Sequence, residues 1–433
     1  MSTHGSLSVT DRPIRPRSVY LSYDGALEPL GASQVVPYVK GLGVRGADIT
    51  LVSFEKPIDW KDSMRVHALR AELAACGVRW VPLRYHKLPP VLATVYDVVR
   101  GLVCVGGRVR RERIPLIHAR SYVAALMAWL LKRGGGVRVI FDMRGFWADE
   151  RVEGGLWAPK GVPYRLAKRL ERLFLEEADE IVTLTECARQ TVQAWLGDRC
   201  PPVTVIPTCV DLEHFPRASM GRSSPTRPRF VYAGSVGTWY AFSEVLRFME
   251  RALKRFSDAQ LLIFTRQTEE AARLLRRSAV PSTHVVITTV EAAQIPRRLA
   301  QAHAGLAFYK PGFSRRGTCP TKLGEYLATG LPVVTNRWIG DVETHLGAEQ
   351  VGVLLSDFSA EAYDRALETL EQMWVDPTLA ARCRQVAERL FSLSSGIERY
   401  WALYARLMAR ATREATGQPC AIREHEPVSQ AAG

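Results

Sequence analysis

A basic and an acidic side chain lie three residues apart in the segment Gly317–Asn336, which reads GTCPTKLGEYLATGLPVVTN. This spacing places Lys322 and Glu325 on one face of a helix. Pro320 suits the first helical turn, so we expect the N–H groups of Thr321 and Lys322 to be free where an anion binds. A helix start that holds a diphosphate, with a carboxylate one turn in to accept ribose hydroxyls, describes a nucleotide-sugar site. From the spacing alone, an ordinary amphipathic helix whose Lys and Glu are solvated is as well supported as this site.

The rest of this segment supports a helix followed by a strand. Leu323, Tyr326 and Leu327 turn towards a core at helical spacing. Gly330 is expected to end the helix, and Leu331–Thr335 has the apolar character of a buried strand.

The chain has 433 residues, of which 47% are hydrophobic, and this length predicts two domains. Its formal net charge of +14 indicates a polyanionic partner, such as a phosphorylated substrate, an anionic membrane surface or nucleic acid. The basic clusters are not interleaved with aromatic residues in a nucleic-acid-binding motif, so no nucleic acid is expected. The alternative explanation of the positive charge is a GC-rich genome, whose base composition favours Arg over Lys. The clusters are Arg108–Arg113, Lys132–Arg138, Arg165–Arg172 and Arg315–Arg316.

Cysteine spacing and the lengths of the apolar runs indicate the cellular compartment of the protein. The eight cysteines form no Cys-x-x-Cys pair, so neither a zinc knuckle nor a disulfide framework is indicated. The sequence begins with polar and basic residues and no apolar signal core, from which we expect a cytoplasmic protein. The apolar runs fall short of the roughly 20 residues that span a bilayer, since Leu88–Gly107 is interrupted by Asp97 and Arg100.

Short apolar runs alternate with helical periodicity in two series, which predicts an α/β protein with two doubly wound parallel sheets. The series are separated by Arg217–Arg229, a polar stretch rich in Ser, Pro and Arg. Two such domains enclose one cleft at the carboxyl ends of their strands. Strands are expected in the first series at Val19–Tyr23, Ile49–Phe54, Arg79–Leu83, Leu116–His118, Val137–Asp142, Ile181–Thr185 and Val203–Ile206. In the second they are expected at Phe230–Ala233, Leu261–Phe264, Val285–Thr288, Gly305–Phe308 and Pro332–Thr335.

The segment Gly317–Asn336 resembles the nucleotide-binding helix of retaining glycosyltransferases of family 4, in which a Glu near the helix start holds the ribose and a Gly-x-Pro-Val-Val run follows. The family carries two glutamates in a Glu-x7-Glu pattern. Glu325 matches the second, and Gly317 stands at the first, where the family has a carboxylate beside the donor sugar. The resemblance extends from about Tyr20 to Leu346.

The resemblance implies the GT-B architecture, in which two Rossmann-like domains face each other across a cleft and a final helix crosses back to the first domain. The expected organisation is an acceptor-binding domain over 1–215, a linker over 216–229, a nucleotide-sugar-binding domain over 230–390, a crossing helix over 391–415 and a disordered tail over 416–433.

The first loop, Tyr23–Tyr38, places a glycine between a strand and a helix. Gly31 lets the backbone approach a ligand closely, and Ser33 is expected to cap the helix so that its free N–H groups face a phosphate. The loop resembles the family loop that reaches across the cleft to the donor diphosphate.

The segment Phe141–Glu150 gathers charged and aromatic side chains after a strand, which a cleft would accommodate. We predict that it binds the acceptor and the donor sugar, with Asp142 or Asp149 accepting sugar hydroxyls. The family has a His after this strand that contacts the sugar; here the position holds Asp142 or, with a small shift, Arg144. The alternative is an internal ion pair of Arg144 with Asp149 or Glu150.

His118, next to Arg120, is expected to end the fourth strand and either to contact substrate at the cleft or to be structural. In the second domain, glycines and a serine follow the first strand at Gly234, Ser235 and Gly237.

Family members carry an Arg and a Lys near this turn to neutralise the diphosphate, and this chain has neither there. Lys322 is the best replacement, with Lys310, Arg315 and Arg316 in reserve. Thr289 and Val290 stand where related enzymes hold the base by backbone contacts.

The resemblance implies same-face transfer of a sugar from a nucleoside-diphosphate sugar to a glycan, lipid-linked or small-molecule acceptor, in cell-surface polysaccharide or glycolipid assembly. The catalytic candidates are Asp142, Arg144, His118 and Lys322. No Asp-x-Asp motif is convincing, so neither a metal ion nor another cofactor is expected. The apolar Leu88–Val105 followed by Arg108–Arg113 fits a peripheral site on the inner face of the cell membrane.

Other classes of protein fit the same architecture. A sugar-nucleotide epimerase would need no acceptor pocket, and a glycan phosphorylase would need a pyridoxal-phosphate lysine environment that the sequence does not indicate. A degenerate transferase that only binds nucleotide or glycan is the non-enzymatic alternative, because Gly317 replaces a Glu and no basic pair follows Gly234.

Overall fold

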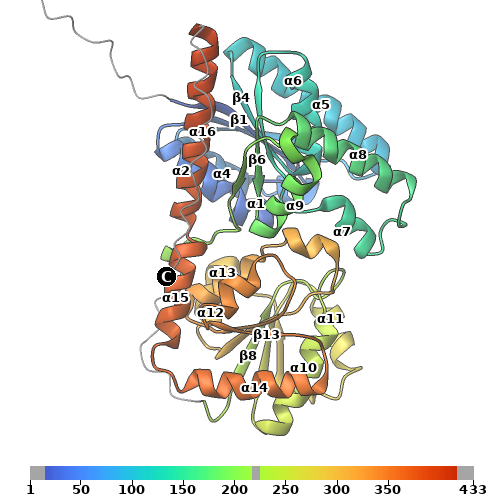
Figure 1. Cartoon of the computed structure of the whole chain (residues 1–433), viewed down its shortest axis with the longest axis vertical. Helices are drawn as coiled ribbons and strands as arrows, with labels where there is room; N and C mark the ends of the chain where they lie inside the picture. Colours follow the sequence, from blue (N-terminus) through green and yellow to red (C-terminus); the bar gives the residue numbers. More distant parts are fainter. Residues whose placement is uncertain (1–14, 217–224, 417–433) are drawn as a thin grey trace, which may run out of the picture.

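A computed structural model describes residues 15–216 and 225–416 as two α/β domains, one above the other in Figure 1. The greater part of the predicted linker, residues 217–224, lies outside the described residues. The tail predicted over 416–433 also lies outside them, apart from Thr416, which ends the last helix.

The first domain is built on a seven-stranded sheet in the order β3-β2-β1-β4-β5-β6-β7, and every neighbouring pair is parallel. The chain moves outwards from β1 in one direction and then in the other, which produces a doubly wound sheet with a crevice where the order reverses. The strands are β1 (Arg17–Ser22), β2 (Asp48–Glu55), β3 (Val78–Arg84), β4 (Leu116–Arg120), β5 (Arg138–Asp142), β6 (Glu180–Thr183) and β7 (Val203–Val205).

Helices cover both faces of this sheet, and a separate apolar cluster lies under each layer. One cluster includes side chains from α5, α6, α8 and α9, and the other includes side chains from α2, α4 and the last helix. The helices are α1 (Pro29–Gln34), α2 (Val36–Val44), α3 (Pro57–Trp60), α4 (Ser63–Ala75), α5 (Pro90–Glu112), α6 (Ser121–Arg133), α7 (Trp147–Glu153), α8 (Val162–Glu177) and α9 (Glu186–Leu196).

The second domain contains a six-stranded parallel sheet in the order β10-β9-β8-β11-β12-β13. Its strands are β8 (Arg229–Ala233), β9 (Gln260–Phe264), β10 (Val285–Thr288), β11 (Ala304–Ala307), β12 (Val333–Asn336) and β13 (Gly352–Leu355). Its helices are α10 (Phe242–Arg255), α11 (Thr268–Leu275), α12 (Ile295–Leu299), α13 (Thr321–Ala328), α14 (Ala360–Trp374) and α15 (Leu379–Leu390). The sequence prediction missed β13, a four-residue edge strand that begins with a glycine and is mostly half-buried.

Short 3-10 helices lie in the connections, and one π-helix precedes β13. They are η1 (Gly197–Arg199), η2 (Leu212–His214), η3 (Ser282–His284), η4 (Ala292–Gln294), η5 (Phe313–Gly317) and the π-helix η6 (Glu343–Gly347).

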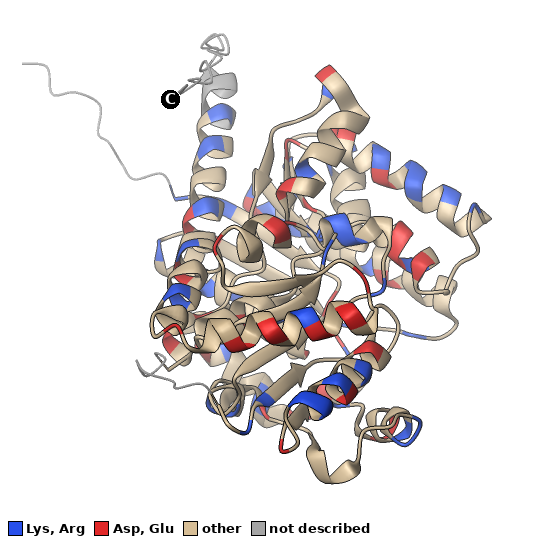
Figure 2. Ribbon diagram, turned by 60° about the horizontal axis from the view of Figure 1, so that its bottom comes forward, with Lys and Arg blue, Asp and Glu red and all other residues tan. Residues whose placement is uncertain are grey.

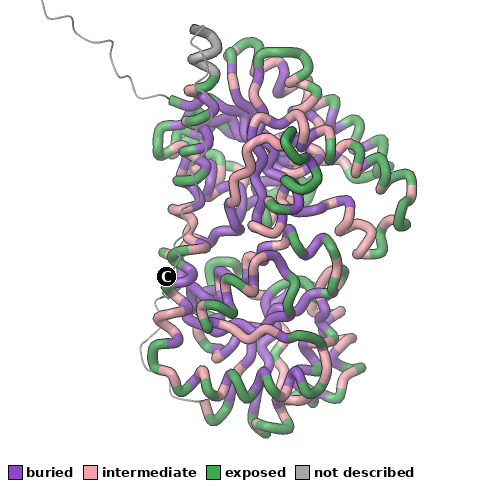
Figure 3. Tube along the Cα trace, in the orientation of Figure 1, coloured by how far each residue is buried: buried purple, intermediate pink, exposed green. Residues whose placement is uncertain are grey.

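The last helix, α16 (Leu393–Thr416), follows α15 of the second domain and runs alongside the first domain against α2 (Figure 1). Tyr400, Leu403 and Tyr404 are buried in the first-domain core. Figure 2 shows Lys and Arg distributed over both domains, with several on this helix. Figure 3 shows that burial is concentrated in the interior of each domain, around the sheets.

Within the described residues, one helix, α5, is long and apolar enough by length and composition to cross a membrane. The sequence prediction had rejected this run because of Asp97 and Arg100. Within its most apolar stretch, 33% of the residues are buried against the rest of the domain, and the others are partly or fully exposed. Asp97 points into that buried side.

Candidate active site

Helix α13 begins at the inner edge of the second domain. Pro320 is its N-cap, with ψ of 128°, so the helix starts at Thr321, one residue later than the sequence suggested. The first hydrogen bond runs from the Leu323 N–H to the Pro320 carbonyl (3.1 Å), and the N–H groups of Thr321 and Lys322 precede it. Gly330 follows the helix with φ of +77°, a left-handed conformation that glycine adopts without strain.

The ammonium group of Lys322 is buried between aromatic rings. Its Nζ lies 4.3 Å from the ring centre of Tyr232 and 4.4 Å from that of Tyr240. It donates no hydrogen bond to any residue that the structure describes. Burial lowers the pKa of Lys322 to about 7. For the half-buried Glu325, loss of solvent raises the pKa to about 7, although the charge of Lys322 opposes that shift. Both side chains are therefore desolvated, and the charge of each opposes the pKa shift of the other only in part.

Gly234 makes room for this ammonium group. Its φ of +131° is in the region that favours glycine, and a Cβ there would lie 3.1 Å from Lys322 Nζ. Four predicted residues of the second domain line one pocket of about 230 Å³, namely Gly234, Ser235, Thr289 and Val290, together with residues of β9 and the loop after it. Gly237 belongs to the same loop as Gly234 but is not among the lining residues.

A second pocket, of about 290 Å³, lies between the domains at the start of α13. Thr321 and Arg144 are the two predicted site residues that line it. The first domain contributes Leu30, Gln34, Arg120, Arg144, Glu150, Leu184 and Thr208; the second contributes Trp239, Tyr240, Tyr309, Arg315, Thr318, Cys319, Pro320 and Thr321.

Three guanidinium groups, those of Arg120 and Arg315 buried and that of Arg144 half-buried, give this interdomain pocket its cationic character. Each has a carboxylate partner at the outer limit of ion-pair distance: Asp24 at 3.5 Å from Arg120, Asp142 at 3.7 Å from Arg144, and Glu153 at 3.8 Å from Arg315. The Nε of Arg120 is buried and has no hydrogen-bond partner among the described residues. These long distances leave hydrogen-bond donors free for an anionic ligand.

Of the cations held in reserve in the sequence analysis, only Arg315 lines the pocket. Lys310 and Arg316 are exposed, and Arg316 Nε donates a hydrogen bond to Thr191 Oγ1 (3.2 Å). The sequence analysis did not select Arg120. The available signal was its place as the last residue of β4, because strand ends open on the crevice of a doubly wound domain.

Asp142 and His118 lie in a closed polar cluster rather than on the pocket surface. Asp142 is fully buried and accepts a hydrogen bond from Tyr400 Oη (2.9 Å). Burial raises its pKa, but Arg144 and then His118 outweigh this and hold it at about 2. Its Oδ2 accepts this hydrogen bond from the protein, whereas its Oδ1 has no hydrogen-bond partner among the described residues, so a contact of Asp142 with sugar hydroxyls stays a prediction.

His118 lies in the middle of β4 rather than at its end, and is fully buried. Its Nδ1 is 2.9 Å from Tyr404 Oη, and its Nε2 is 3.5 Å from Asp142. Burial lowers its pKa below the usual value, and Asp142 opposes this shift. Helix α16 covers both residues, which the first-domain sequence could not reveal.

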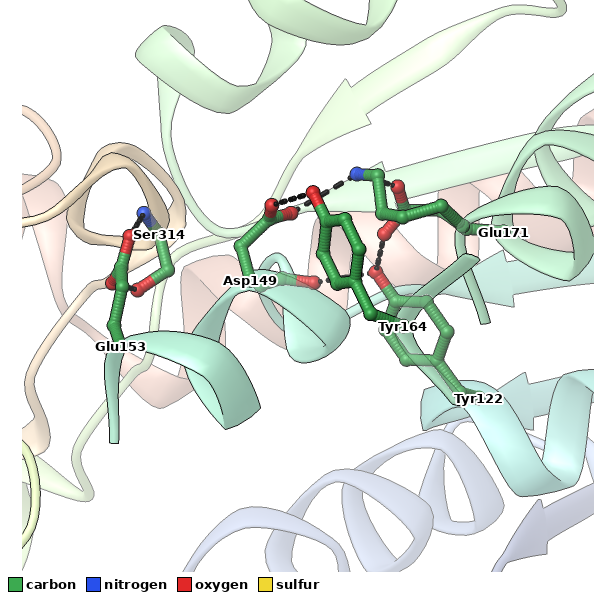
Figure 4. A network of polar contacts seen from close by, with 8 residues as sticks. Tyr122, Asp149, Glu153, Tyr164, Glu171 and Ser314 are labelled. Carbon is green, nitrogen blue, oxygen red and sulfur yellow. Dashed lines mark hydrogen bonds and ion pairs between the residues drawn. The ribbon is translucent and has the colours of Figure 1, made fainter. Parts of the chain in front are cut away.

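Asp149 is hydrogen-bonded within the first domain. Its carboxylate accepts hydrogen bonds from Tyr164 Oη (2.9 Å) and Lys168 Nζ (3.0 Å), as Figure 4 shows. Arg144 forms its ion pair with Asp142, so the alternative pairing with Asp149 or Glu150 is wrong. Glu150 is the acidic residue of this segment that lines the interdomain pocket.

The first loop differs from its predicted geometry. Helix α1 begins at Pro29, with Glu28 as its N-cap, so Ser33 lies near the C-terminal end of the helix and caps nothing. Pro29 starts the helix earlier because its fixed φ suits the first turn. Gly31 is required for packing within the protein, since a Cβ there would lie 1.9 Å from the Gly25 carbonyl oxygen.

A side chain at Gly317 would be crowded by its neighbours. A Cβ at this position would lie 3.0 Å from the Phe146 ring and 3.2 Å from Gly145 Cα. The carboxylate of Glu150 occupies the same neighbourhood. A Cβ built on Gly145 would meet Glu150 Oε1 at 3.1 Å and the Gly317 carbonyl oxygen at 3.5 Å. Glu150 of the first domain thus places its carboxylate near Gly317, the position at which the family has a Glu and this chain has none.

Polar contacts join η5 to the first domain next to the pocket. Glu153 accepts hydrogen bonds from the backbone N–H of Ser314 (2.9 Å) and from its hydroxyl (Figure 4). Thr185 Oγ1 donates to the Arg316 carbonyl at 2.6 Å. The Trp239 indole N–H donates to the Glu150 carbonyl at 3.0 Å. These contacts fix the two walls of the interdomain pocket relative to each other.

The comparisons with known proteins agree with this architecture. A family model described as "Glycosyl transferase 4-like domain" matches residues 31–209, and one described as "Glycosyl transferases group 1" matches residues 227–372. Two Rossmann-like domains that face across a cleft constitute the GT-B fold. The chain belongs to the group 1 glycosyltransferases with this fold. No curated protein matches the chain significantly.

Solved structures share the fold at low sequence identity. Sucrose-phosphate synthase from Thermosynechococcus elongatus has a TM-score of 0.68 at 15% identity, covering 92% of this chain and 100% of its own. A glycosyltransferase from Rickettsia africae has a TM-score of 0.67 at 13% identity, with coverage of 91% and 99%. Anabaena Alr3699/HepE in complex with UDP has a TM-score of 0.66 at 11% identity, with coverage of 90% and 100%.

Proposed function

We propose that the protein is a retaining hexosyltransferase that moves a sugar from a nucleoside-diphosphate sugar to a glycan, lipid-linked or small-molecule acceptor, in cell-surface polysaccharide or glycolipid assembly. The observation that carries this proposal is the buried Lys322 ammonium group at the start of α13, with Glu325 one turn further on. A buried cation without a hydrogen-bond partner among the described residues costs stability, and a bound diphosphate would compensate that cost. The HepE structures solved with UDP and with UDP-glucose support a nucleotide sugar as ligand.

In this proposal the two pockets bind different parts of the nucleotide-sugar donor. The pocket at Gly234, Ser235, Thr289 and Val290 takes the nucleoside, and the interdomain pocket takes the diphosphate and the sugar. Glu325 accepts the ribose hydroxyls. The N–H groups that begin α13, with Lys322 and Arg315, receive the negative charge that grows on the diphosphate as the glycosidic bond breaks. In the proposal this cationic set makes a metal ion and any other cofactor unnecessary.

Glu150 takes the place of the carboxylate that the family has at Gly317. Its position on the pocket wall, beside Gly317, lets it accept hydroxyls of the donor sugar. Burial raises its pKa above the usual value, with Arg315 opposing the shift, so contact with sugar hydroxyls would replace lost solvent. The missing first Glu of the family pattern is then compensated from the opposite domain.

The acceptor approaches from the first domain, where Arg120 and Arg144 line the pocket. Asp142 and His118 act through Arg144, because their cluster fixes the guanidinium without reaching the pocket. We propose that the transfer takes place in the cytoplasm, since Cys76, Cys104 and Cys187 are thiols and not disulfides, which is typical of a reducing compartment.

Release of nucleoside diphosphate from a panel of UDP, GDP and ADP sugars, with and without a chelator, tests the assigned site. Lys322→Ala and Glu325→Ala should each lower the release at least about tenfold, because each removes one charge-assisted contact. Lys310→Ala is the matched control, since Lys310 is exposed and does not line the pocket. Unchanged turnover in Lys322→Ala, or loss of turnover with the chelator, would contradict the proposal.

A separate variant tests the sugar contact. Glu150→Gln should lower kcat/KM for the nucleotide sugar while leaving the affinity for the free nucleoside diphosphate unchanged, because the carboxylate faces the sugar. Product analysis separates the rival activities: an epimerised nucleotide sugar without transfer indicates an epimerase, and binding without turnover of any donor indicates a degenerate transferase.

A further inference from the structure

Helix α5 exposes a continuous apolar stripe on the outer side of the first domain. The stripe consists of Leu88, Val91, Leu92, Val95, Tyr96, Val99 and Val103. The exposed fraction is 76% for Leu88, 75% for Val91 and 72% for Val103. Leu88 lies just before the helix, and spacings of three and four residues place the other side chains on one helix face. Contiguous exposed apolar surface of this kind marks an interaction site.

We propose that this α5 stripe docks the protein on an anionic lipid bilayer, with the helix lying in the plane of the membrane interface. Lipid acyl chains would cover the apolar side chains, and anionic headgroups would meet the basic residues at the two ends of the helix. In Figure 1 the helix lies on the side of the first domain away from α16, which leaves its outer face uncovered.

The opposite face of α5 is fixed in the domain, so the stripe cannot turn inwards. Ala93, Val98 and Val105 are buried, and Gly101 packs so closely that a Cβ there would lie 2.3 Å from Met127 Sδ. Asp97 is fully buried on this face and accepts hydrogen bonds from Tyr23 Oη (3.1 Å) and the His86 N–H (2.9 Å). A helix held by these contacts lies on a membrane rather than crossing it.

The charges around the stripe select an anionic partner. Arg84 and Lys87 are exposed before the helix, and Arg110, Arg111 and Arg113 are exposed at its end. The two acidic residues between positions 84 and 113 are both engaged: Asp97 is buried, and Glu112 pairs with Arg79 at 2.8 Å and Arg108 at 3.3 Å. A second copy of the chain seated on the stripe would bring like charges together, whereas anionic headgroups complement them.

The buried face of α5 is linked to a segment that reaches the interdomain pocket. The hydrogen bond between Tyr23 and Asp97 joins α5 to the loop after β1, and this loop continues into α1, which contributes Leu30 and Gln34 to the pocket.

Vesicle flotation of the full chain tests the docking. The protein should float with vesicles of phosphatidylcholine and phosphatidylglycerol and bind pure phosphatidylcholine at least about tenfold more weakly, because several exposed basic residues contribute. The double variant Leu92→Glu with Val99→Glu should lose at least about tenfold of the binding, and Arg110→Ala with Arg111→Ala should lose the preference for phosphatidylglycerol.

Val375→Glu is the matched control, because Val375 is 69% exposed on the second domain and should float like the wild type. Donor hydrolysis without vesicles should be the same in the Leu92→Glu, Val99→Glu variant, which shows that the fold and the pocket are intact. Equal binding to neutral vesicles, or unchanged flotation of that variant, would overturn the proposal. A wild-type dimer in sedimentation that becomes a monomer in the variant would overturn it too, because a second copy would then cover the stripe.

Discussion

Tyr400 Oη donates a hydrogen bond of 2.9 Å to Asp142, a residue 258 positions earlier in the chain. Asp142 lies 3.7 Å from Arg144, whose side chain lines the interdomain pocket. The C-terminal helix that emerges from the second domain thus supports an arginine of the first domain at the candidate active site. The crossing helix is therefore part of the site's scaffold as well as of the domain connection.

Removing this hydrogen bond should weaken the first domain. We expect Tyr400→Phe to lower the free energy of unfolding by about 1–2 kcal/mol, because it removes a buried hydrogen bond to an ionised carboxylate. Urea unfolding measures this change. Tyr96→Phe provides the control, since Tyr96 is 53% exposed on α5 and should change stability by less than about 0.5 kcal/mol. Equal unfolding free energies for both variants would show that the Tyr400 hydroxyl contributes nothing.

Asp142 should also contribute to acid stability. Its pKa is about 2 in the folded protein against 3.8 for an ordinary aspartate, so its stabilising contribution is present above about pH 4 and is lost as pH falls through 2. We expect Asp142→Asn to be destabilised by on the order of 2 kcal/mol or more at pH 7. The difference in unfolding free energy from the wild type should shrink between pH 4 and pH 2. A difference that stays constant with pH would mean that the ionised form is not what Arg144 stabilises.

The fold was accessible from the sequence because parallel strands are buried on both faces and appear as short apolar runs. All seven strands of the first sheet and five of the six in the second sheet coincide with such runs. The edge strand β13 lacks this signal because it is short and only partly buried. The length and apolar character of helix α5 were underestimated, because this apolar stretch contains several glycines and one buried acid and has no clear capping signal.

The site was predictable only where its geometry is local. The start of α13 and the shared face of Lys322 and Glu325 follow from neighbouring residues. The position of Glu150 beside Gly317 depends on two loops from different domains. The enclosure of His118 depends on α16, which lies far along the chain. Sequence patterns within one segment carry no information on such contacts.

The desolvated Lys322 should lower the stability of the ligand-free protein. Its pKa falls from 10.5 to about 7 on folding, so the unfolded chain binds more protons between these values and stability rises with pH across that range. Lys322→Met keeps the apolar stem and removes the charge. We expect it to raise the free energy of unfolding at pH 7 by about 1–3 kcal/mol and to abolish donor binding. The gain should disappear near pH 10.5. Thermal unfolding at several pH values measures it, and a destabilised variant at pH 7 would contradict this role.

Donor affinity should fall as pH rises above 7. The ammonium form of Lys322 binds the diphosphate, and the pKa of about 7 in the free protein means that above this pH a proton must be taken up on binding. Affinity is thus fully present below pH 7 and falls by up to about tenfold per pH unit above it. Calorimetric titration with a UDP or GDP sugar measures this slope, because the diphosphate of a nucleotide sugar stays ionised in the same range.

The guanidinium of Lys322→Arg does not titrate there, so this variant should bind with little dependence on pH. The same slope in Lys322→Arg would assign the proton to another group and remove Lys322 from the diphosphate site.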